Sequence, residues 1–302
     1  MPFKKITDIK KLKLRANEIR LDIIRMLVSA GSGHSAGPLD MADVFTAVYF
    51  NVMNHDPKNP KWEGRDKFVL SNGHICPVLY ATLAHAGYFP RKELLTLRKL
   101  GTRLHGHPHN LALPGLENSA GPLAQGFSVA CGIALAAKMD KKKTRVYCSL
   151  GDGEMQEGQV WEALMFAAKY KLDNLTAFVD RNYIQIDGPT EDIMPLDPFA
   201  AKIKAFNWHV IEIDGNKMES IVKAFKDAQK VKGKPTMLIC NTIPGKGVTY
   251  MEGRFEWHGK PPTKDQGEIA IMELCKQEYK LQGIHCKSCA TTLSDCKCLE
   301  GE

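Results

Sequence analysis

The stretch that decides the fold runs from Thr144 to Ile184 and reads TRVYCSLGDGEMQEGQVWEALMFAAKYKLDNLTAFVDRNYI. Residues 144–150 form an apolar, strand-like run. Residues 156–170 carry apolar side chains at helical spacing, and residues 175–179 are again strand-like. A strand, a helix and a second strand in this order predict a βαβ unit with two parallel strands.

Polar residues follow both predicted strands at the point where each ends. Gly151-Asp152-Gly153 follows the first strand, and Asn182 stands thirty residues beyond Asp152, just past the second. In a right-handed βαβ unit both positions lie at the carboxyl edge of the sheet, where such folds bind ligands. Carboxylate and amide oxygens suit Mg²⁺, which takes phosphate oxygens for its remaining positions. The glycines let the backbone approach a diphosphate, and the next helix adds its positive N-terminal end. Either fragment alone is consistent with an ordinary turn, but together they predict a metal–diphosphate site.

The remaining sequence extends this pattern. A long irregular run, residues 90–122, is typical of a functional or disordered loop. The fold class is therefore predicted to be α/β, a mostly parallel sheet with helices on both faces, in one domain over residues 1–280. Hydrophobic periodicity ends there, and residues 281–302 form a cysteine-rich tail. The other predicted helices are 8–29, 39–52, 77–86, 127–138 and 220–231, and the other predicted strands are 210–213 and 236–240.

Composition excludes several classes of protein. Hydrophobic residues make up 44% and charged residues 25% of the 302 residues, which is typical of a globular chain. The sequence has no run of about eighteen apolar residues and no apolar leader at its start, so neither a membrane nor a secreted protein is expected. The net charge of +7 comes without a nucleic-acid-binding module, and anionic small substrates suit it instead. A cytoplasmic location is expected because four cysteines lie scattered in apolar stretches as reduced thiols: Cys76, Cys131, Cys148 and Cys240.

Seven short sequence motifs occur in the order in which one protein family has them. From about residue 9 to residue 279 the chain resembles the N-terminal half of a transketolase, which implies the thiamine diphosphate-binding fold. The blocks are Ser32-Gly-His-Ser-Ala-Gly37, Ser71-Asn-Gly-His74, Gly106-His-Pro108, Gly121-Pro-Leu-Ala-Gln-Gly126, Gly151-Asp-Gly153 with Glu157-Gly158, Asn182-Tyr-Ile-Gln-Ile-Asp-Gly188 and Trp257-His-Gly-Lys-Pro261.

The resemblance implies roles for particular residues. The side chains of Asp152 and Asn182 and the Ile184 carbonyl would bind Mg²⁺, or Ca²⁺ or Mn²⁺ in its place. Imidazole has a pKa near neutrality and suits the proton transfers of ketol transfer. The residues implied to bind thiamine diphosphate are His74, Gly121, Pro122, Leu123, Gly153, Glu157, Asn182 and His258. The histidines implied to be catalytic are His34, His74, His107 and His258.

The other histidines have a plainer interpretation. His55, His85, His209 and His285 are expected to be surface or satisfied core residues. For His105 and His109 both interpretations stay open. His109 is also a departure from the family, which commonly has an acidic residue there.

The function implied is that of the N-terminal subunit of a transketolase, which moves a two-carbon ketol unit from a ketose phosphate to an aldose phosphate in pentose phosphate metabolism. The pyrimidine-binding domain would come from a separate C-terminal subunit, in an α2β2 assembly. One alternative is a related enzyme such as a deoxyxylulose-phosphate synthase, which the Trp257-His258-Gly259 block disfavours. Another is a non-catalytic, metal-binding interaction subunit, which the intact Asp152 and Asn182 disfavour.

The tail holds two close cysteine pairs. They offer four thiolates for tetrahedral Zn²⁺, although the spacer between the pairs is short for a zinc ribbon. A solvated, reduced tail is the other interpretation. The four residues are Cys286, Cys289, Cys296 and Cys298.

Overall fold

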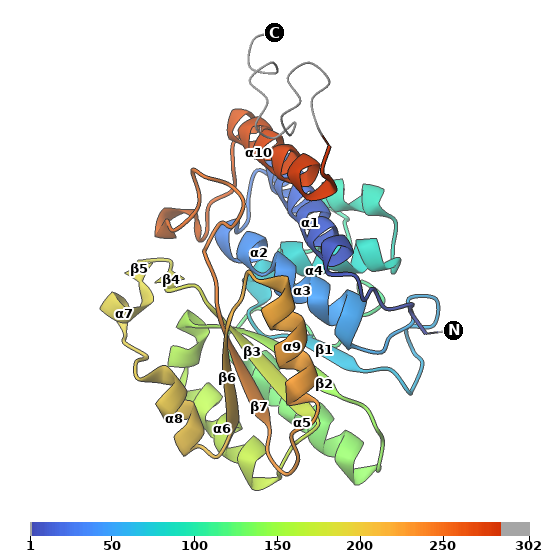
Figure 1. Ribbon diagram of the computed structural model, residues 1–302, viewed down its shortest axis with the longest axis vertical. Coiled ribbons are helices and arrows are strands. Elements are labelled where there is room, and N and C mark those ends of the chain that lie inside the picture. The colour runs from blue at the N-terminus through green and yellow to red at the C-terminus, as the bar shows by residue number, and fades with distance from the viewer. Residues whose placement is uncertain (1, 285–302) are drawn as a thin grey trace.

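A five-stranded parallel sheet forms the centre of the protein. The computed structural model describes residues 2–284. The strands lie in the order β1-β2-β3-β7-β6, and all neighbours are parallel (Figure 1). Their bounds are β1 Lys67–Leu70, β2 Val146–Gly151, β3 Leu175–Arg181, β6 His209–Asp214 and β7 Thr236–Asn241. A small antiparallel pair, β4 (Ile184–Gln185) and β5 (Gly188–Pro189), follows β3.

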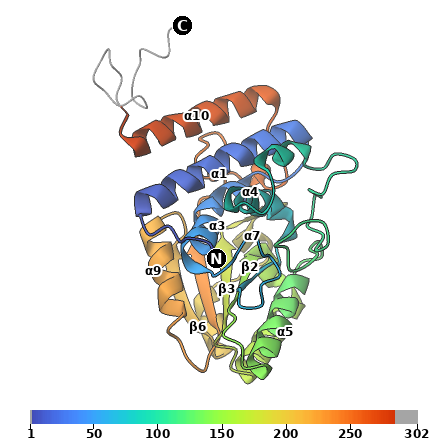
Figure 2. The same ribbon diagram turned by 90° about the vertical axis from the view of Figure 1, so that its right-hand side faces the viewer.

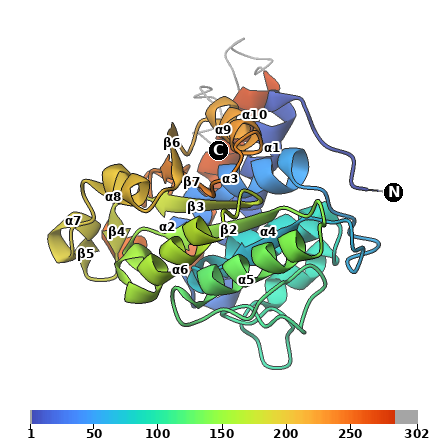
Figure 3. The same ribbon diagram turned by 90° about the horizontal axis from the view of Figure 1, so that it is seen from below.

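Helices cover both faces of this sheet, as the sequence predicted. α5 and α6 lie on one face, and α1, α3 and α9 lie on the other (Figure 3). Side chains alternate between the two cores, so Phe178 of β3 enters one and its neighbours Ala177 and Val179 enter the other. The helices are α1 Ile9–Ala30, α2 Ala36–Asp40, α3 Ala42–Ala47, α4 Cys76–Ala86, α5 Gln125–Met139, α6 Gly158–Lys169, α7 Thr190–Ile193, α8 Phe199–Ala205, α9 Met218–Ala228 and α10 Lys264–Gln282.

The long helices begin and end at recognisable capping residues. The Asp8 side chain accepts hydrogen bonds from the backbone N–H groups of Lys10 and Lys11 at the start of α1, and Gly31 ends that helix in the left-handed conformation. α10 starts with a capping box between Thr263 and Gln266, and it packs along α1 (Figure 2). No helix within residues 2–284 is long and apolar enough to cross a membrane.

The helix predicted over residues 39–52 is wrong as a single element. It is divided into α2, α3 and a π-helical turn, Val48–Val52. The break has a cause in tertiary contacts, because side chains from elsewhere take two successive carbonyl oxygens. Arg20 Nε donates to the Leu39 carbonyl at 2.9 Å, and Asn216 Nδ2 donates to the Asp40 carbonyl at 2.9 Å.

Candidate active site at the carboxyl ends of the strands

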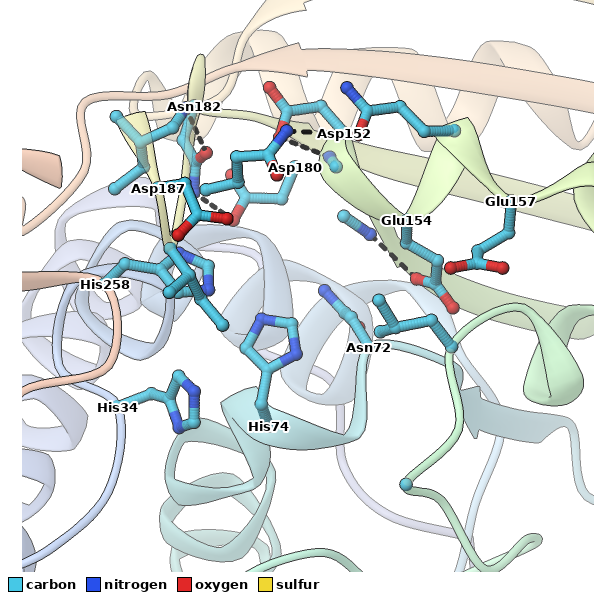
Figure 4. A pocket seen from close by; sticks show the side chains of 18 of the residues that line it. His34, Asn72, His74, Asp152, Glu154, Glu157, Asp180, Asn182, Asp187 and His258 are labelled. Atoms are coloured by element: carbon cyan, nitrogen blue, oxygen red, sulfur yellow. Dashed lines mark hydrogen bonds between the residues drawn. The ribbon is translucent and has the colours of Figure 1, made fainter. Parts of the chain in front are cut away.

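A cavity of about 460 Å³ opens where β2 and β3 end (Figure 4). All the site residues expected from the sequence line it except Pro122. The expected residues that it brings together are His34, His74, His107, Gly121, Leu123, Asp152, Gly153, Glu157, Asn182, Ile184 and His258. Residues from segments as distant as 34 and 258 therefore meet in one place.

Asp152 is held in a fixed position at the base of this cavity. Its Oδ1 accepts a hydrogen bond from the Gly153 backbone at 2.7 Å, and its Oδ2 accepts from the Tyr183 backbone at 2.9 Å and from Thr190 Oγ1 at 3.1 Å. The buried Arg181 donates to the same Oδ2 at 3.2 Å. Burial raises the pKa of Asp152 to about 6, against the opposing effect of Arg181. A bound cation would favour the ionised form.

Asn182 lies between two buried acidic side chains. Its Nδ2 donates to Asp40 Oδ2 at 3.1 Å and to Asp180 Oδ2 at 3.0 Å, while its Oδ1 accepts from the Ile184 backbone at 3.2 Å. Because both N–H groups are used, the orientation of the amide is fixed and its oxygen stays on the side of Ile184. Burial raises the pKa of both Asp40 and Asp180 above the ordinary carboxyl value. The charge of Asp180 adds to the rise at Asp40, and the charge of Asp152 adds to the rise at Asp180.

The donor set fits a hard divalent cation. Asp152, Asn182 and Ile184 all line the cavity, and they offer a carboxylate, an amide oxygen and a backbone carbonyl. Within residues 2–284 no three His, Cys, Asp or Glu side chains are grouped as a metal site, but this donor set contains only one such side chain. The four cysteines expected as zinc ligands lie outside the described residues.

Three imidazoles form a cluster on the opposite wall. The ring centroids of His34 and His74 are 4.9 Å apart, those of His74 and His258 are 5.2 Å apart, and those of His34 and His258 are 5.5 Å apart. Burial lowers the pKa of all three, and it lowers that of His34 to about 4 with help from the charges of His258 and Arg98. At neutral pH the rings are therefore uncharged. The Nδ1 atoms of His34 and His258 are buried and have no hydrogen-bond partner within the described chain.

The histidines expected to be surface or satisfied core residues are so wherever the structure describes them. His55 is fully buried and bonded to Tyr88 and to the Tyr49 carbonyl, and His85 is bonded to Asp22. His209 is exposed on the edge strand β6. The two histidines left open, His105 and His109, are exposed, and their rings are 5.9 Å apart. His285 lies outside the described residues.

Glu154 is a buried carboxyl that the sequence did not single out. Its Oε1 accepts hydrogen bonds from Ser71 Oγ at 2.5 Å and from the Ala124 backbone at 2.7 Å, and its Oε2 accepts from the Gly151 backbone at 3.0 Å. One side chain thus joins three loops of the cavity wall. Burial raises the pKa of Glu154 to about 7.

Two more residues of the cavity wall, Asn72 and Asp180, were also missed. Like Glu154, each stands two positions from a residue that the sequence did single out. Extending the search along the ends of the predicted strands would have found Glu154 and Asp180, whereas Asn72 follows β1, which the sequence did not predict.

Ala124 stands at a position where the transketolase family that this chain resembles usually has a glycine. Its φ is +69°, in the left-handed region, at the residue before α5. Glycine adopts that conformation freely, whereas alanine is strained there by roughly 1–2 kcal/mol.

We expect Ala124→Gly to leave stability nearly unchanged. The relief of strain offsets the lost methyl contacts and the flexibility that glycine adds. The matched control is Ala134→Gly, at a fully buried position inside α5, where nothing offsets those losses and the cost is roughly 1.5–2 kcal/mol. Urea denaturation of both variants measures the difference, and equal costs would contradict the strain at Ala124.

Comparison with known proteins identifies the family. Residues 12–281 match the family described as transketolase, thiamine diphosphate binding domain. A 6-deoxy-6-sulfo-D-fructose transketolase subunit from a Clostridium species is 45% identical over 266 residues, which cover 88% of this chain and 97% of the relative. An apulose-4-phosphate transketolase subunit from Phocaeicola vulgatus is 41% identical over 91% of this chain and 98% of its own length.

Solved structures agree with this assignment. A transketolase mutant from Pichia stipitis superposes with a TM-score of 0.81 at 31% identity, over 92% of this chain and 46% of that one. The transketolase from Campylobacter jejuni gives 0.80 at 30% identity, over 92% and 48%. The chain spans about half the length of these solved enzymes. The prediction of a transketolase N-terminal subunit is confirmed over the synthase alternative, and the chain belongs to the transketolase family as its thiamine diphosphate-binding part.

Proposed function

We propose that this chain is the diphosphate-binding subunit of a two-subunit transketolase that transfers a two-carbon ketol unit from a ketose phosphate to an aldose phosphate. The single observation that carries the proposal is the meeting of the oxygen donors and the neutral histidine cluster in one cavity. The similar relatives of about the same length are named as transketolase subunits. Their names concern a sulfonated and a phosphorylated sugar, so the substrates expected here are anionic sugars, with a role in pentose phosphate metabolism.

In this proposal the base of the cavity holds the diphosphate end of the cofactor. Asp152, Asn182 and the Ile184 carbonyl bind Mg²⁺, and the glycines at 121 and 153 leave room for the cofactor beside them. Pro122 and Leu123 continue the same loop, and Glu157 stands at the start of α6. Thiamine diphosphate, when bound, supplies the nucleophilic carbon that takes up the ketol unit.

The histidine cluster is assigned the proton transfers. His34, His74 and His258 are uncharged at neutral pH, so each ring has one nitrogen that accepts a proton and one that donates. His107 lies on the exposed loop at the mouth of the cavity, where it meets an entering sugar. Burial also lowers the pKa of His107, as does the charge of Arg98.

Binding of the cofactor tests this proposal. Calorimetric titration of the chain, together with its C-terminal partner, should show saturable binding of thiamine diphosphate that depends on Mg²⁺. Binding that is equally tight with excess EDTA would contradict the metal assignment. A complete absence of binding would contradict the proposed function.

We expect His258→Ala to lower kcat by roughly 10²–10⁴-fold, the usual contribution of general acid–base catalysis. The affinity for thiamine diphosphate should fall much less, because the proposed role of His258 is at the reacting carbon. His209→Ala is the control, since His209 is an exposed histidine on β6. Steady-state assays of the complex measure both variants, and an unchanged kcat in His258→Ala would show that the ring takes no part.

A domain boundary and a location complete the proposal. α10 ends at Gln282 with Gly283 in the left-handed conformation, which supports a core that ends near residue 280. The buried free thiols Cys76, Cys131, Cys148 and Cys240 favour the reducing cytoplasm. An α2β2 assembly is proposed with the partner.

Removal of residues 285–302 is expected to leave the affinity for thiamine diphosphate unchanged, because residues between 34 and 258 of the described chain already line the cavity. If the tail cysteines bind Zn²⁺, the zinc content should fall. Elemental analysis and cofactor titration of both forms separate the two expectations. Equal zinc contents in the two forms would contradict a zinc site in the tail. A loss of cofactor affinity in the shortened form would show that the tail contributes to the cofactor-binding domain.

A further inference from the structure

Asn72 is a buried amide without a partner in the wall of the cavity. It lies in the turn between β1 and the 3₁₀ turn Gly73–Ile75, and its exposed fraction is 1%. Neither Nδ2 nor Oδ1 has a hydrogen-bond partner within residues 2–284. Its side chain lines the cavity beside His74 and Glu154 (Figure 4).

An amide in this state destabilises the protein that carries it. A buried polar group without a hydrogen bond costs roughly 1–3 kcal/mol, and most buried side-chain polar atoms in native proteins have a partner. An apolar residue of the same size would avoid this cost, so the presence of an asparagine at position 72 needs an explanation.

The position of Asn72 is fixed by its neighbours. Ser71 Oγ donates to the buried Glu154 at 2.5 Å, and the Ser71 backbone N–H donates to the Ser149 carbonyl at 3.0 Å. The Gly73 and Ile75 N–H groups close the turn on the carbonyls of Ser71 and Asn72 at 2.9 and 3.1 Å. The backbone thus holds the side chain where it is.

Two glycine segments proposed for the cofactor surround this amide. A Cβ atom on Gly151 would lie 3.9 Å from Asn72 Nδ2, and one on Gly73 would lie 3.1 Å from the Gly121 backbone nitrogen. Asn72 is therefore placed deep in the cavity, between the Gly121 loop and the end of β2. The exposed His107 lies at the mouth instead.

We propose that the side-chain amide of Asn72 is a binding group for thiamine diphosphate, whose diphosphate oxygens accept a hydrogen bond from Asn72 Nδ2. This inference rests on the proposed function, because it needs that cofactor in the cavity. The deep position favours the cofactor over the sugar, which enters from the side of His107. The amide binds without adding charge next to the diphosphate.

Asn72→Leu tests the proposal, because leucine has a similar volume and no polar atom. Titration of the chain with its C-terminal partner by thiamine diphosphate and Mg²⁺ should give an affinity roughly tenfold to a hundredfold weaker than that of the parent. The unfolding temperature of the ligand-free chain should stay the same or rise, since no hydrogen bond within the described chain is lost. Asn72→Ala should weaken cofactor binding in the same way, while the cavity that it leaves at this buried position lowers the unfolding temperature of the ligand-free chain. Asn72→Asp should bind more weakly still, because it places a second negative charge beside the diphosphate.

Ser149→Ala is the matched control. Its hydroxyl is also fully buried and unpartnered within residues 2–284, and Ser149 pairs with Leu70 in the adjoining strand, but it does not line the cavity. Its replacement should leave the cofactor affinity unchanged.

Each other result has a separate meaning. If the parent binds the cofactor and Asn72→Leu and Asn72→Ala bind it equally well, the inference is wrong and the proposed function stands. If the parent itself does not bind, the proposed function fails. An unchanged cofactor affinity with a raised KM for the sugar would assign Asn72 to the substrate and overturn the proposal. A fall in the ligand-free stability of Asn72→Leu that accompanies its weaker binding would also overturn the proposal.

Discussion

Replacing Asp152 with alanine is expected to abolish ketol transfer and the dependence of cofactor binding on Mg²⁺. Asp152 is the only carboxylate in the proposed donor set, so its loss leaves the metal with neutral oxygen ligands and the diphosphate poorly neutralised. Assays of the complex over a range of Mg²⁺ and thiamine diphosphate concentrations measure the effect. Turnover equal to that of the parent would contradict the metal site.

Asp152 also stabilises the fold, and the experiment must separate the two roles. Its Oδ2 accepts from the buried Arg181, and removing one partner of a buried ion pair costs roughly 3 kcal/mol. Arg181 keeps Glu191 and Asp197, which limits the loss. Asp152→Asn retains the size of the side chain and one acceptor oxygen, so it should fold better than the alanine variant and still lose metal-dependent activity.

Asp197→Asn is the control for the ion pair. Asp197 bonds to the same Arg181 at 3.4 Å, but its side chain is 67% exposed and it does not line the cavity. Its replacement should change stability little and leave Mg²⁺ dependence as in the parent. If it lost activity as Asp152→Asn does, the effect would belong to Arg181 and not to the metal.

The sequence predicted the parts of the site that follow from local pattern. Asp152 and Asn182 stand directly after apolar strands, so the topology of a βαβ unit was enough to bring them to one sheet edge. The strands and helices from residue 125 onward that were predicted lie within three residues of their observed bounds. The histidines were placed by resemblance, since no spacing rule joins His34 to His258.

What the sequence missed depends on contacts between distant segments. The helix predicted over residues 39–52 breaks because Arg20 and Asn216 take its carbonyl oxygens. Glu154 looks like an exposed residue in a turn, and only the fold turns it toward Ser71 and Ala124. The short strand β1 has four residues, too few for a periodic signal.

Catalysis is expected to depend on the partner subunit. This chain alone should catalyse no ketol transfer, even with saturating thiamine diphosphate, Mg²⁺ and pentose phosphates. Forming the reactive cofactor requires an acidic group that activates its aminopyrimidine, and the transketolase resemblance places that group in the C-terminal part.

An exposed apolar edge beside the cavity supports the need for a partner. Ile186, which lines the cavity, is 69% exposed, and Ile193 and Met194 of the same segment are 44% and 58% exposed. This segment carries β4, β5 and α7, which project from one side of the molecule (Figure 1). Such a patch is typical of a surface that another protein covers.

The most direct measurement is a titration of this chain with the cognate C-terminal subunit, assayed for transfer of a two-carbon unit from xylulose 5-phosphate to ribose 5-phosphate. Activity should be absent at the start, rise with the amount of partner and saturate when each site is complete. Full transfer by this chain alone, from a preparation free of host transketolase, would contradict a site shared between two subunits.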